Sequence, residues 1–488
     1  LFILLLCCSL VLSGVVCNVI QPDQAKIITT TPETSEDLVT RTLVPTFTPE
    51  PVNSPTPTIE PTATTEPTPT LTPSPTPEIM FEQLPRLHPE SLDVVSLSKP
   101  IKSSLEETRP DITDMQSVST THFKIHFTLV GEDAVPTADL DNSGTPDYVE
   151  TLANALEYIW ETSVEVFSWT APPSDENYGG DDLYDVYLLN VVDAEDAFGY
   201  VDGGYRFTRV GDNPNSEIVE TRAHHSYMVL DNDYSIEENA DFTPEQLLFS
   251  TSAHEFMHSL QFGYDGEEPA EWLWEATATW FQDELFNNIN DANLELESVF
   301  KSPDTCLLAY GGEERLEDEY HWYGLWIFIR HLSENYGHEA VRLLWENAIL
   351  LNSFTAIETT FRSLGTDLES ELRDYALALL IRGFEEGADY PTVRLEGATN
   401  FSDIFVPTDG VGQIAVDFIE IEADGNIIIR LNTENQLVPV AAGYRDGQLS
   451  VFTSDDNVLS VESSQFDHLY LLVLNNEKAR NEIECSFM

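Results

Sequence analysis

A run of Thr and Pro limits where this chain can fold. Between Pro45 and Pro77, 22 of the 33 residues are Thr or Pro, and the run contains no Lys, Arg or Gly. Such a segment has too few large apolar side chains to bury a core, and its Pro residues favour an extended polyproline conformation. We therefore expect a semi-rigid stalk over residues 18–80, with the folded part after it. A disordered leader is the alternative.

The residues ahead of the stalk are apolar. Leu1 to Val16 carry no charge and have the length of a signal-peptide core, which is short for a membrane span. We therefore expect residues 1–17 to direct export, so that the protein is secreted or extracellular. Cys17 follows a loosely lipoprotein-like signal, and a lipid anchor there is the one membrane contact that the sequence suggests.

Charge excludes one class of partner. The chain has 22 Lys and Arg against 86 Asp and Glu, a formal charge of -64, which repels nucleic acid and anionic lipid. Five Cys show no disulfide framework or Cys-based metal site, and Cys306 and Cys485 are either a disulfide pair or two thiols.

After the stalk, strands are followed by helices. Alternation predicts strands at 123–129, 185–191 and 226–230, and apolar spacings of three and four predict helices near 148–167, 244–262, 270–286, 323–335, 338–349 and 367–382. This order predicts an α+β domain over 121–395. Short strands and turns then predict a small C-terminal β-sandwich over 396–488. Residues 81–120 are a pro-segment or an entry segment.

Two histidines one helical turn apart mark a candidate metal site. Thr243, Pro244 and Gln246 supply the signals that begin a helix. This helix carries the run His254-Glu255-Phe256-Met257-His258, so both imidazoles project from one face and can reach the same ion. A catalytic zinc takes three protein ligands. The next helical stretch has a Glu among aromatic and apolar residues, where a buried carboxylate is costly unless it meets a cation.

That stretch, Trp272-Leu273-Trp274-Glu275-Ala276-Thr277-Ala278-Thr279-Trp280, resembles the run around the third zinc ligand in gluzincin metallopeptidases, the class of thermolysin and aminopeptidase N. The resemblance covers roughly residues 121–395 and is specific at 252–282. It is closest to secreted bacterial metallopeptidases of this type that carry a calcium loop ahead of the zinc helix. It implies a zincin-like catalytic domain, in which a sheet and the zinc helix precede a helical lobe. It also implies Glu275 as the third ligand, with Glu271 as the fallback.

The resemblance implies zinc-dependent hydrolysis of a protein or peptide substrate. Glu255 is then the general base toward a zinc-activated water. Tyr323 lies in an aromatic cluster where gluzincins of aminopeptidase type place an oxyanion donor, although Tyr320 and His321 are also candidates and all three residues can serve as packing instead.

The sequence departs from the family pattern in two places. Thermolysin-like members have an Asp four residues after the ligand Glu, where it supports a zinc-binding His, whereas this chain has Thr279. The Gly-x-x-Glu-Asn element that anchors a substrate amine in aminopeptidases is absent, which favours an endopeptidase. The strand Ser226–Leu230 is the candidate edge for pairing with an extended substrate.

A second motif predicts a calcium site. The segment from Asp139 to Glu150 places oxygen ligands at loop positions 1, 3, 5, 7, 9 and 12, with Gly144 at the sharp turn. An Asx-rich turn without an ion is the alternative. The expected calcium ligands are Asp139, Asp141, Ser143, the Thr145 carbonyl, Asp147 and Glu150.

Two other functions remain compatible with the sequence. One is a stalked cell-surface binding module whose zinc site is structural or inactive. Glu255 argues against that function, because a structural site has no need for a carboxylate beside the metal. The other is a different zinc hydrolase, either an exopeptidase or a non-proteolytic hydrolase or lysin, which shares the same zinc chemistry and is separated only by a substrate test.

Overall fold

The computed structural model describes residues 14–17 and 109–476, apart from residues 112, 176, 193–196, 204–207, 236–241, 309–320, 352, 400–409, 432–436 and 455–457. The predicted stalk therefore lies outside the described residues. These residues belong to one compact unit. No helix in the described ranges combines the length and apolar character that crossing a membrane requires.

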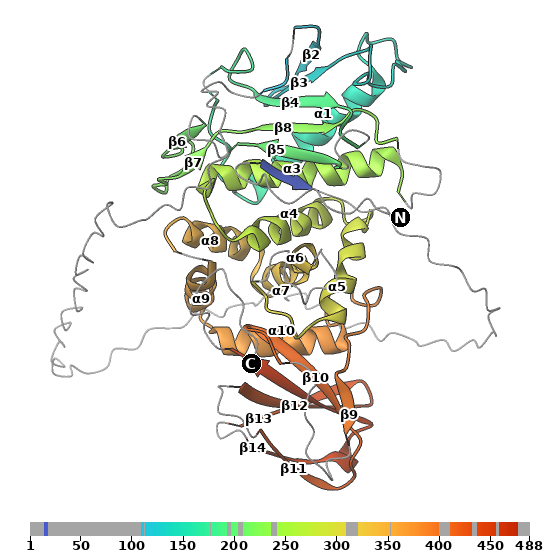
Figure 1. Cartoon of the computed structure of the whole chain (residues 1–488), viewed down its shortest axis with the longest axis vertical. Helices are drawn as coiled ribbons and strands as arrows, with labels where there is room; N and C mark the ends of the chain where they lie inside the picture. Colours follow the sequence, from blue (N-terminus) through green and yellow to red (C-terminus); the bar gives the residue numbers. More distant parts are fainter. Residues whose placement is uncertain are drawn as a thin grey trace, which may run out of the picture. The chain divides into compact units, whose positions relative to one another are not determined.

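The first layer is a mixed six-stranded sheet in the order β1-β5-β8-β4-β3-β2 (Figure 1). Its strands are β1 (Gly14–Cys17), β2 (Gln116–Ser119), β3 (Phe123–Phe127), β4 (Tyr184–Leu189), β5 (Gly199–Asp202) and β8 (Tyr227–Asp231). The three central strands β3, β4 and β8 are parallel, whereas β5 runs antiparallel to β8. A separate small ribbon pairs β6 (Arg209–Gly211) with β7 (Ala223–His224).

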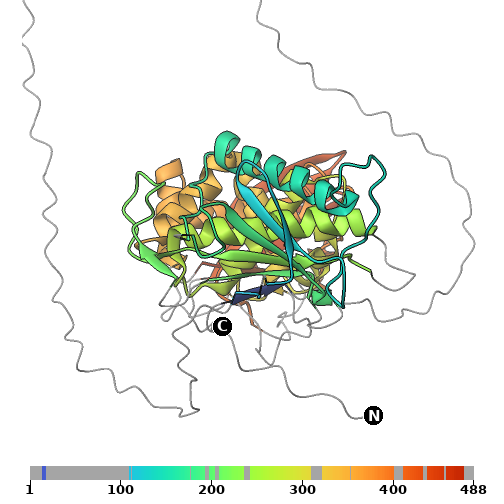
Figure 2. The same ribbon diagram turned by 90° about the horizontal axis from the view of Figure 1, so that it is seen from above.

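Two helices pack on this sheet. Helix α1 (Asp147–Trp160) continues into a π-helix (Glu161–Val166), and α3 (Pro244–Asp265) begins with the predicted capping box of Thr243 and Gln246. The two helices contact each other, α1 contacts β3, and α3 contacts β5 and β8, so they cover the same face of the sheet (Figure 2). Helix α3 is buried almost throughout because α4 (Glu271–Leu285) covers its other side.

A helical lobe follows α4. It contains a 3-10 helix η2 (Asp291–Glu295) and the helices α5 (Leu296–Lys301), α6 (His321–Gly324), α7 (Trp326–Tyr336), α8 (His338–Ala348), α9 (Ser353–Leu364) and α10 (Leu368–Ile381). The six predicted helices are confirmed to within a few residues, with the last turn of the first one replaced by the π-helix and a break at Leu325. α5 and α9 had not been predicted.

The C-terminal part contains two sheets. Five strands pair in the order β13-β12-β15-β10-β9, and two others pair as β11-β14. Their bounds are β9 (Gly397–Thr399), β10 (Ala415–Ile421), β11 (Asn426–Arg430), β12 (Leu437–Arg445), β13 (Gln448–Thr453), β14 (Val458–Glu462) and β15 (His468–Asn475).

The three middle strands of the five-stranded sheet, β10, β12 and β15, are largely buried on both faces. Along β10, Val416 and Phe418 join the large core that includes the helical lobe, whereas Ala415 and Ile419 join a second core with β11 and β14. Because successive side chains of a strand point to opposite faces, one sheet can serve both cores. The α+β class is confirmed, and the domain boundaries stay predictions.

The expected substrate edge was placed on the wrong strand. β8 corresponds to the predicted strand at 226–230, yet it pairs with both β4 and β5 and is an interior strand. Beyond β8 lies β5, which also contacts α3, a four-residue strand that the sequence pattern did not reveal. In this structure β5 also pairs with β1, from Gly14↔Asp202 to Cys17↔Gly199.

Buried acidic residues make the stability of the fold depend on pH. Asp417 on β10 is one of them. Burial, with repulsion from Asp304 and Glu396, raises the pKa of Asp417 to about 7, although Arg394 opposes the rise. The folded chain therefore keeps a proton that the unfolded chain releases near pH 4, so this contribution to stability is lost as the pH rises toward about 7. Replacing Asp417 with Asn should reduce the loss of unfolding free energy between about pH 5 and about pH 7 by roughly 1–2 kcal/mol.

Urea unfolding at both pH values measures this effect. The matched control is Asp446→Asn, because the Asp446 side chain is 90% exposed. Equal pH dependence in Asp417→Asn, Asp446→Asn and the wild type would contradict the role assigned to Asp417.

Candidate metal centre

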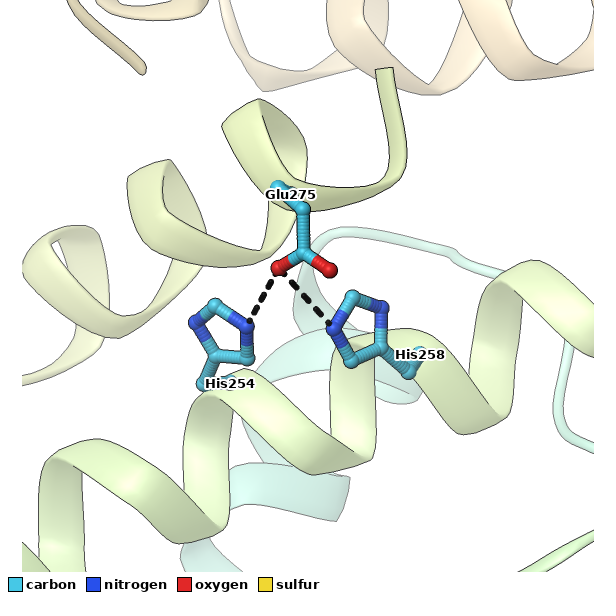
Figure 3. A group of neighbouring side chains, drawn as sticks. All are labelled: His254, His258 and Glu275. Carbon is cyan, nitrogen blue, oxygen red and sulfur yellow. Dashed lines mark hydrogen bonds and ion pairs between the residues drawn. The ribbon is translucent and has the colours of Figure 1, made fainter. Parts of the chain in front are cut away.

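Three predicted ligands converge between α3 and α4. His254 and His258 project from α3 toward α4, and Glu275 on α4 points back at both rings (Figure 3). All three residues are buried, with Glu275 only 4% exposed. Their nitrogen and oxygen ligand atoms lie within 4.8 Å of one another. The structure thus brings together residues from two helices that the sequence could only list separately.

The spacing of these atoms fits a tetrahedral metal. Glu275 Oε2 lies 3.3 Å from His254 Nε2 and 3.6 Å from His258 Nε2. Zinc bonds to nitrogen and oxygen are about 2.0–2.1 Å long, so two ligands of a tetrahedral zinc lie roughly 3.3 Å apart. His258 Nε2 is buried and makes no hydrogen bond within the described part of the chain. An ion there would satisfy that nitrogen.

The charge of Glu275 also suits a cation. Burial alone raises the pKa of its carboxyl, but the electrostatic attraction of His258 and His254, together with the hydrogen bond to His254, lowers that pKa to about 2. The side chain is therefore a carboxylate at neutral pH. Two imidazoles and one carboxylate leave the fourth position of a tetrahedral metal for water or substrate, as in catalytic zinc sites.

The other ring nitrogen of each histidine is held by a glutamine. His254 Nδ1 lies 2.7 Å from Gln282 Oε1, and His258 Nδ1 lies 2.7 Å from Gln261 Oε1. Sequence reasoning missed both glutamines. A signal was present, since Gln282 lies two helical turns after Glu275 and Gln261 one turn after His258. Thr279, at the position that supports a histidine in thermolysin-like enzymes, is buried without a hydrogen-bond partner for its hydroxyl within the described residues.

Glu255 lies against strand β5 of the sheet. Its side chain is fully buried on α3, next to the ligand His254. A Cβ atom added to Gly199 on β5 would come within 3.1 Å of Glu255 Cγ and 3.0 Å of the Val229 carbonyl oxygen. The absence of a side chain at Gly199 therefore lets the backbone of β5 pass directly beside this carboxylate.

The structure separates the candidate oxyanion donors. The ring of Tyr323 on α6 is centred 6.2 Å from the ring of His254, so this tyrosine lies next to the metal ligands. His321 instead lines a small cavity with Leu325 and Ile414, and burial lowers its pKa to about 4. That environment favours packing. Tyr320 lies outside the described residues.

The predicted calcium loop brings three carboxylates together. Asp139, Asp141 and Asp147 have oxygen atoms within 4.8 Å of one another. The backbone N–H of Ser143 donates to Asp139 and Asp141 at 3.0 and 2.9 Å, and Gly144, at φ 91°, donates to Asp139 at 3.0 Å.

The remaining expected calcium ligands lie around this group. The Ser143 hydroxyl donates to the Thr145 carbonyl at 3.2 Å, so both oxygens are already close to each other. Glu150 lies in the first turn of α1 and is outside the group of three carboxylates.

The chain matches no protein-family model, and no curated protein matches its sequence. The resemblance to gluzincins therefore depends on the motif residues and their geometry.

Metal binding distinguishes the two candidate third ligands. Glu271 is in the first turn of α4 and is not part of the three-residue group, so only Glu275 should matter. We expect Glu275→Gln to weaken zinc binding by more than about 100-fold, because it removes the anionic ligand. Competition with a chromogenic chelator on the metal-stripped chain measures this, and Glu271→Gln is the matched control. Equal losses in the two variants would rule out the assignment.

Proposed function

We propose that this protein is a zinc-dependent peptidase of gluzincin type, with His254, His258 and Glu275 as the zinc ligands. The observation that carries the proposal is the spacing of the buried ligand atoms. His254 Nε2 and His258 Nε2 lie 3.3 and 3.6 Å from the same carboxylate oxygen of Glu275. The zincin-like fold belongs to the same proposal. It is supported by a mixed sheet whose antiparallel strand β5 lies against the helix that carries both histidines.

Zinc in this site would supply a Lewis acid that lowers the pKa of a water molecule and polarises the scissile carbonyl. Glu255 accepts the proton of the attacking water and passes it to the leaving amine. Its burial beside His254 keeps bulk water from competing for that proton. Tyr323, next to His254, donates a hydrogen bond to the carbonyl oxygen as negative charge develops there.

The substrate pairs with β5 in this proposal. An extended peptide can add to an outer strand through backbone hydrogen bonds, and β5 passes directly over Glu255 at Gly199. Gly14–Cys17 occupies that edge here, antiparallel to β5, which gives the pairing direction that a substrate would take. Removal of an export signal ending near Cys17 would free the edge. A substrate that pairs through its backbone favours internal cleavage. The same proposal, with its export signal, places the protein outside the cell.

Cleavage of a mixed peptide library tests the proposal. With zinc and calcium present, the wild type should cut peptides internally, and Glu255→Gln should be slower by about 10²–10⁴-fold because the general base is lost. Mass spectrometry of the products measures both rates and positions. Zinc content measured on the same samples is the control, since this substitution leaves the three ligands in place.

Each outcome of this test separates one function from another. Trimming from the peptide ends alone would indicate an exopeptidase. Equal turnover by the two proteins would contradict the role of Glu255 and favour the binding module.

We also propose that the loop from Asp139 to Glu150 binds calcium with a structural role. The loop leads directly into α1, where the Tyr148 hydroxyl donates to the Asp231 carbonyl at 2.9 Å. Asp231 ends β8, the strand before the zinc helix. Its carboxylate accepts backbone N–H groups of Val191 and Val192 at 2.9 and 2.8 Å. An ion in the loop would thus stabilise the side of the sheet that supports α3.

Calcium should raise the stability of the chain. At a free concentration about 100 times its dissociation constant, the expected gain in unfolding free energy is about 2.7 kcal/mol. Asp141→Asn should remove most of this gain because it removes one of the three converging carboxylates. Thermal unfolding with calcium and with chelator measures the difference, and Glu165→Gln, at an exposed position beyond α1, is the control. A calcium effect of unchanged size in Asp141→Asn would place the ion elsewhere.

A further inference from the structure

Tyr234, in the loop after β8, has a backbone conformation that bulky residues rarely adopt. Its φ is 47°, in the left-handed region, where a residue with a large side chain is strained. The Asp231 carboxylate holds this conformation, because it accepts the backbone N–H of Tyr234 at 2.6 Å and that of Asp233 at 3.0 Å. Strain of this kind persists only where the surrounding structure enforces it, and it is common near functional sites.

The Tyr234 side chain reaches the residue that leads into β5. Its hydroxyl donates to the Phe198 carbonyl oxygen at 3.0 Å, and its ring packs edge-on against the Phe198 ring, with the ring centres 5.9 Å apart. The same carbonyl oxygen accepts the backbone N–H of Asp231 at 3.2 Å. Two donors from the end of β8 and the loop after it therefore hold the start of β5.

The residue after Phe198 makes the closest contact between β5 and the candidate general base. A Cβ atom placed on Gly199 would lie 3.1 Å from Glu255 Cγ and 3.0 Å from the Val229 carbonyl oxygen. The backbone of β5 is thus confined between Glu255 and β8. A displacement at Phe198 would therefore move this backbone relative to the Glu255 carboxylate.

The Tyr234 hydroxyl is a lasting hydrogen-bond donor. The side chain is 1% exposed, and burial, together with the negative charges of Asp231 and Glu255, raises the pKa of Tyr234 well above its usual value. The hydroxyl therefore keeps its proton at neutral pH, and the hydrogen bond to Phe198 is not lost by ionisation.

We propose that Tyr234 is a positioning residue that holds the start of β5 beside Glu255 and so aligns a substrate backbone paired with β5. The proposal rests on the proposed peptidase function, but the contact between Tyr234 and Phe198 is a property of the chain alone. Tyr234 acts through β5 and takes no part in the proton transfer assigned to Glu255. Alignment matters because a displacement of about 1 Å can slow a reaction by about 100-fold.

Tyr234→Phe tests the proposal because it removes the hydroxyl and keeps the ring. Loss of one buried hydrogen bond should make the amides of β5 exchange with solvent about five- to tenfold faster. kcat should fall by about tenfold, because the scissile bond is held less well against the attacking water, whereas KM should change by less than about threefold. Zinc affinity should stay the same, since the three ligands lie on α3 and α4.

Three measurements on the full-length chain check these results. Hydrogen–deuterium exchange with mass spectrometry follows peptides that contain Gly199–Asp202, cleavage of one library peptide gives kcat and KM, and chelator competition gives zinc affinity. Tyr264→Phe is the matched control. Tyr264 is also 1% exposed, and its hydroxyl accepts the backbone N–H of Thr170 at 3.1 Å near the far end of α3. This control loses a comparable hydrogen bond and should leave both β5 exchange and kcat unchanged.

Each outcome supports or overturns the proposal. Exchange of β5 in Tyr234→Phe that equals that of the wild type or of Tyr264→Phe would overturn it, and so would faster exchange with an unchanged kcat. A wild type that cleaves no peptide would overturn the proposed function instead, and the exchange data would still decide whether Tyr234 holds β5. If Tyr234→Phe does not fold, Tyr234→Asn, which tolerates the left-handed backbone better, should show the faster exchange, and unchanged exchange would overturn the proposal.

Discussion

The contact between Glu275 and two histidines organises the centre of this protein. A carboxylate that is almost completely buried is unfavourable unless an opposite charge or strong hydrogen bonds compensate it. Here the attraction of His258 and His254 and the hydrogen bond to His254 compensate it, and they lower the pKa of Glu275 to about 2 despite its burial. The contact requires α3 and α4 to lie side by side with their polar residues facing each other, while their other faces are apolar and pack against the sheet and the helical lobe.

The polar residues around this contact form a connected set. Gln282 and Gln261 satisfy the outer nitrogens of the two rings, and each glutamine is satisfied in turn by Asp291 or by a backbone carbonyl. In a site without bulk water, such pairing avoids the cost of an unsatisfied polar group. It also keeps the ring nitrogens that face Glu275 available for a metal. The same hydrogen bonds therefore stabilise the site and keep it able to bind a metal.

The sheet forms one wall of the site, whereas the three candidate ligands lie on helices α3 and α4. β5 passes beside Glu255 because Gly199 has no side chain, and it runs antiparallel to β8 next to α3. The predicted calcium loop leads into α1, which is connected to the same sheet through Tyr148 and Asp231. Cys306 in the helical lobe is disulfide-bonded, and Cys485, its candidate partner, lies outside the described residues.

Features that depend on short-range spacing could be predicted from the chain alone. The capping signals, the separation of His254 and His258 by one turn, and the carboxylates of the calcium loop are all local, and so are the apolar periods that predicted six helices and the α+β class. The choice of Glu275 over Glu271 came from a resemblance, and only the packing of α4 on α3 showed which carboxylate reaches the rings.

Strand β5 and the residues that contact the candidate ligands could be found only in the folded molecule. β5 is four residues long and its order relative to β8 depends on pairing between segments distant in sequence, so no local period could reveal it. Asp291 reaches His254 only through Gln282, across three elements of the fold. Such contacts are set by how helices pack rather than by the residues next to them in the chain, which is why the sequence could supply the histidines but not the groups that orient them.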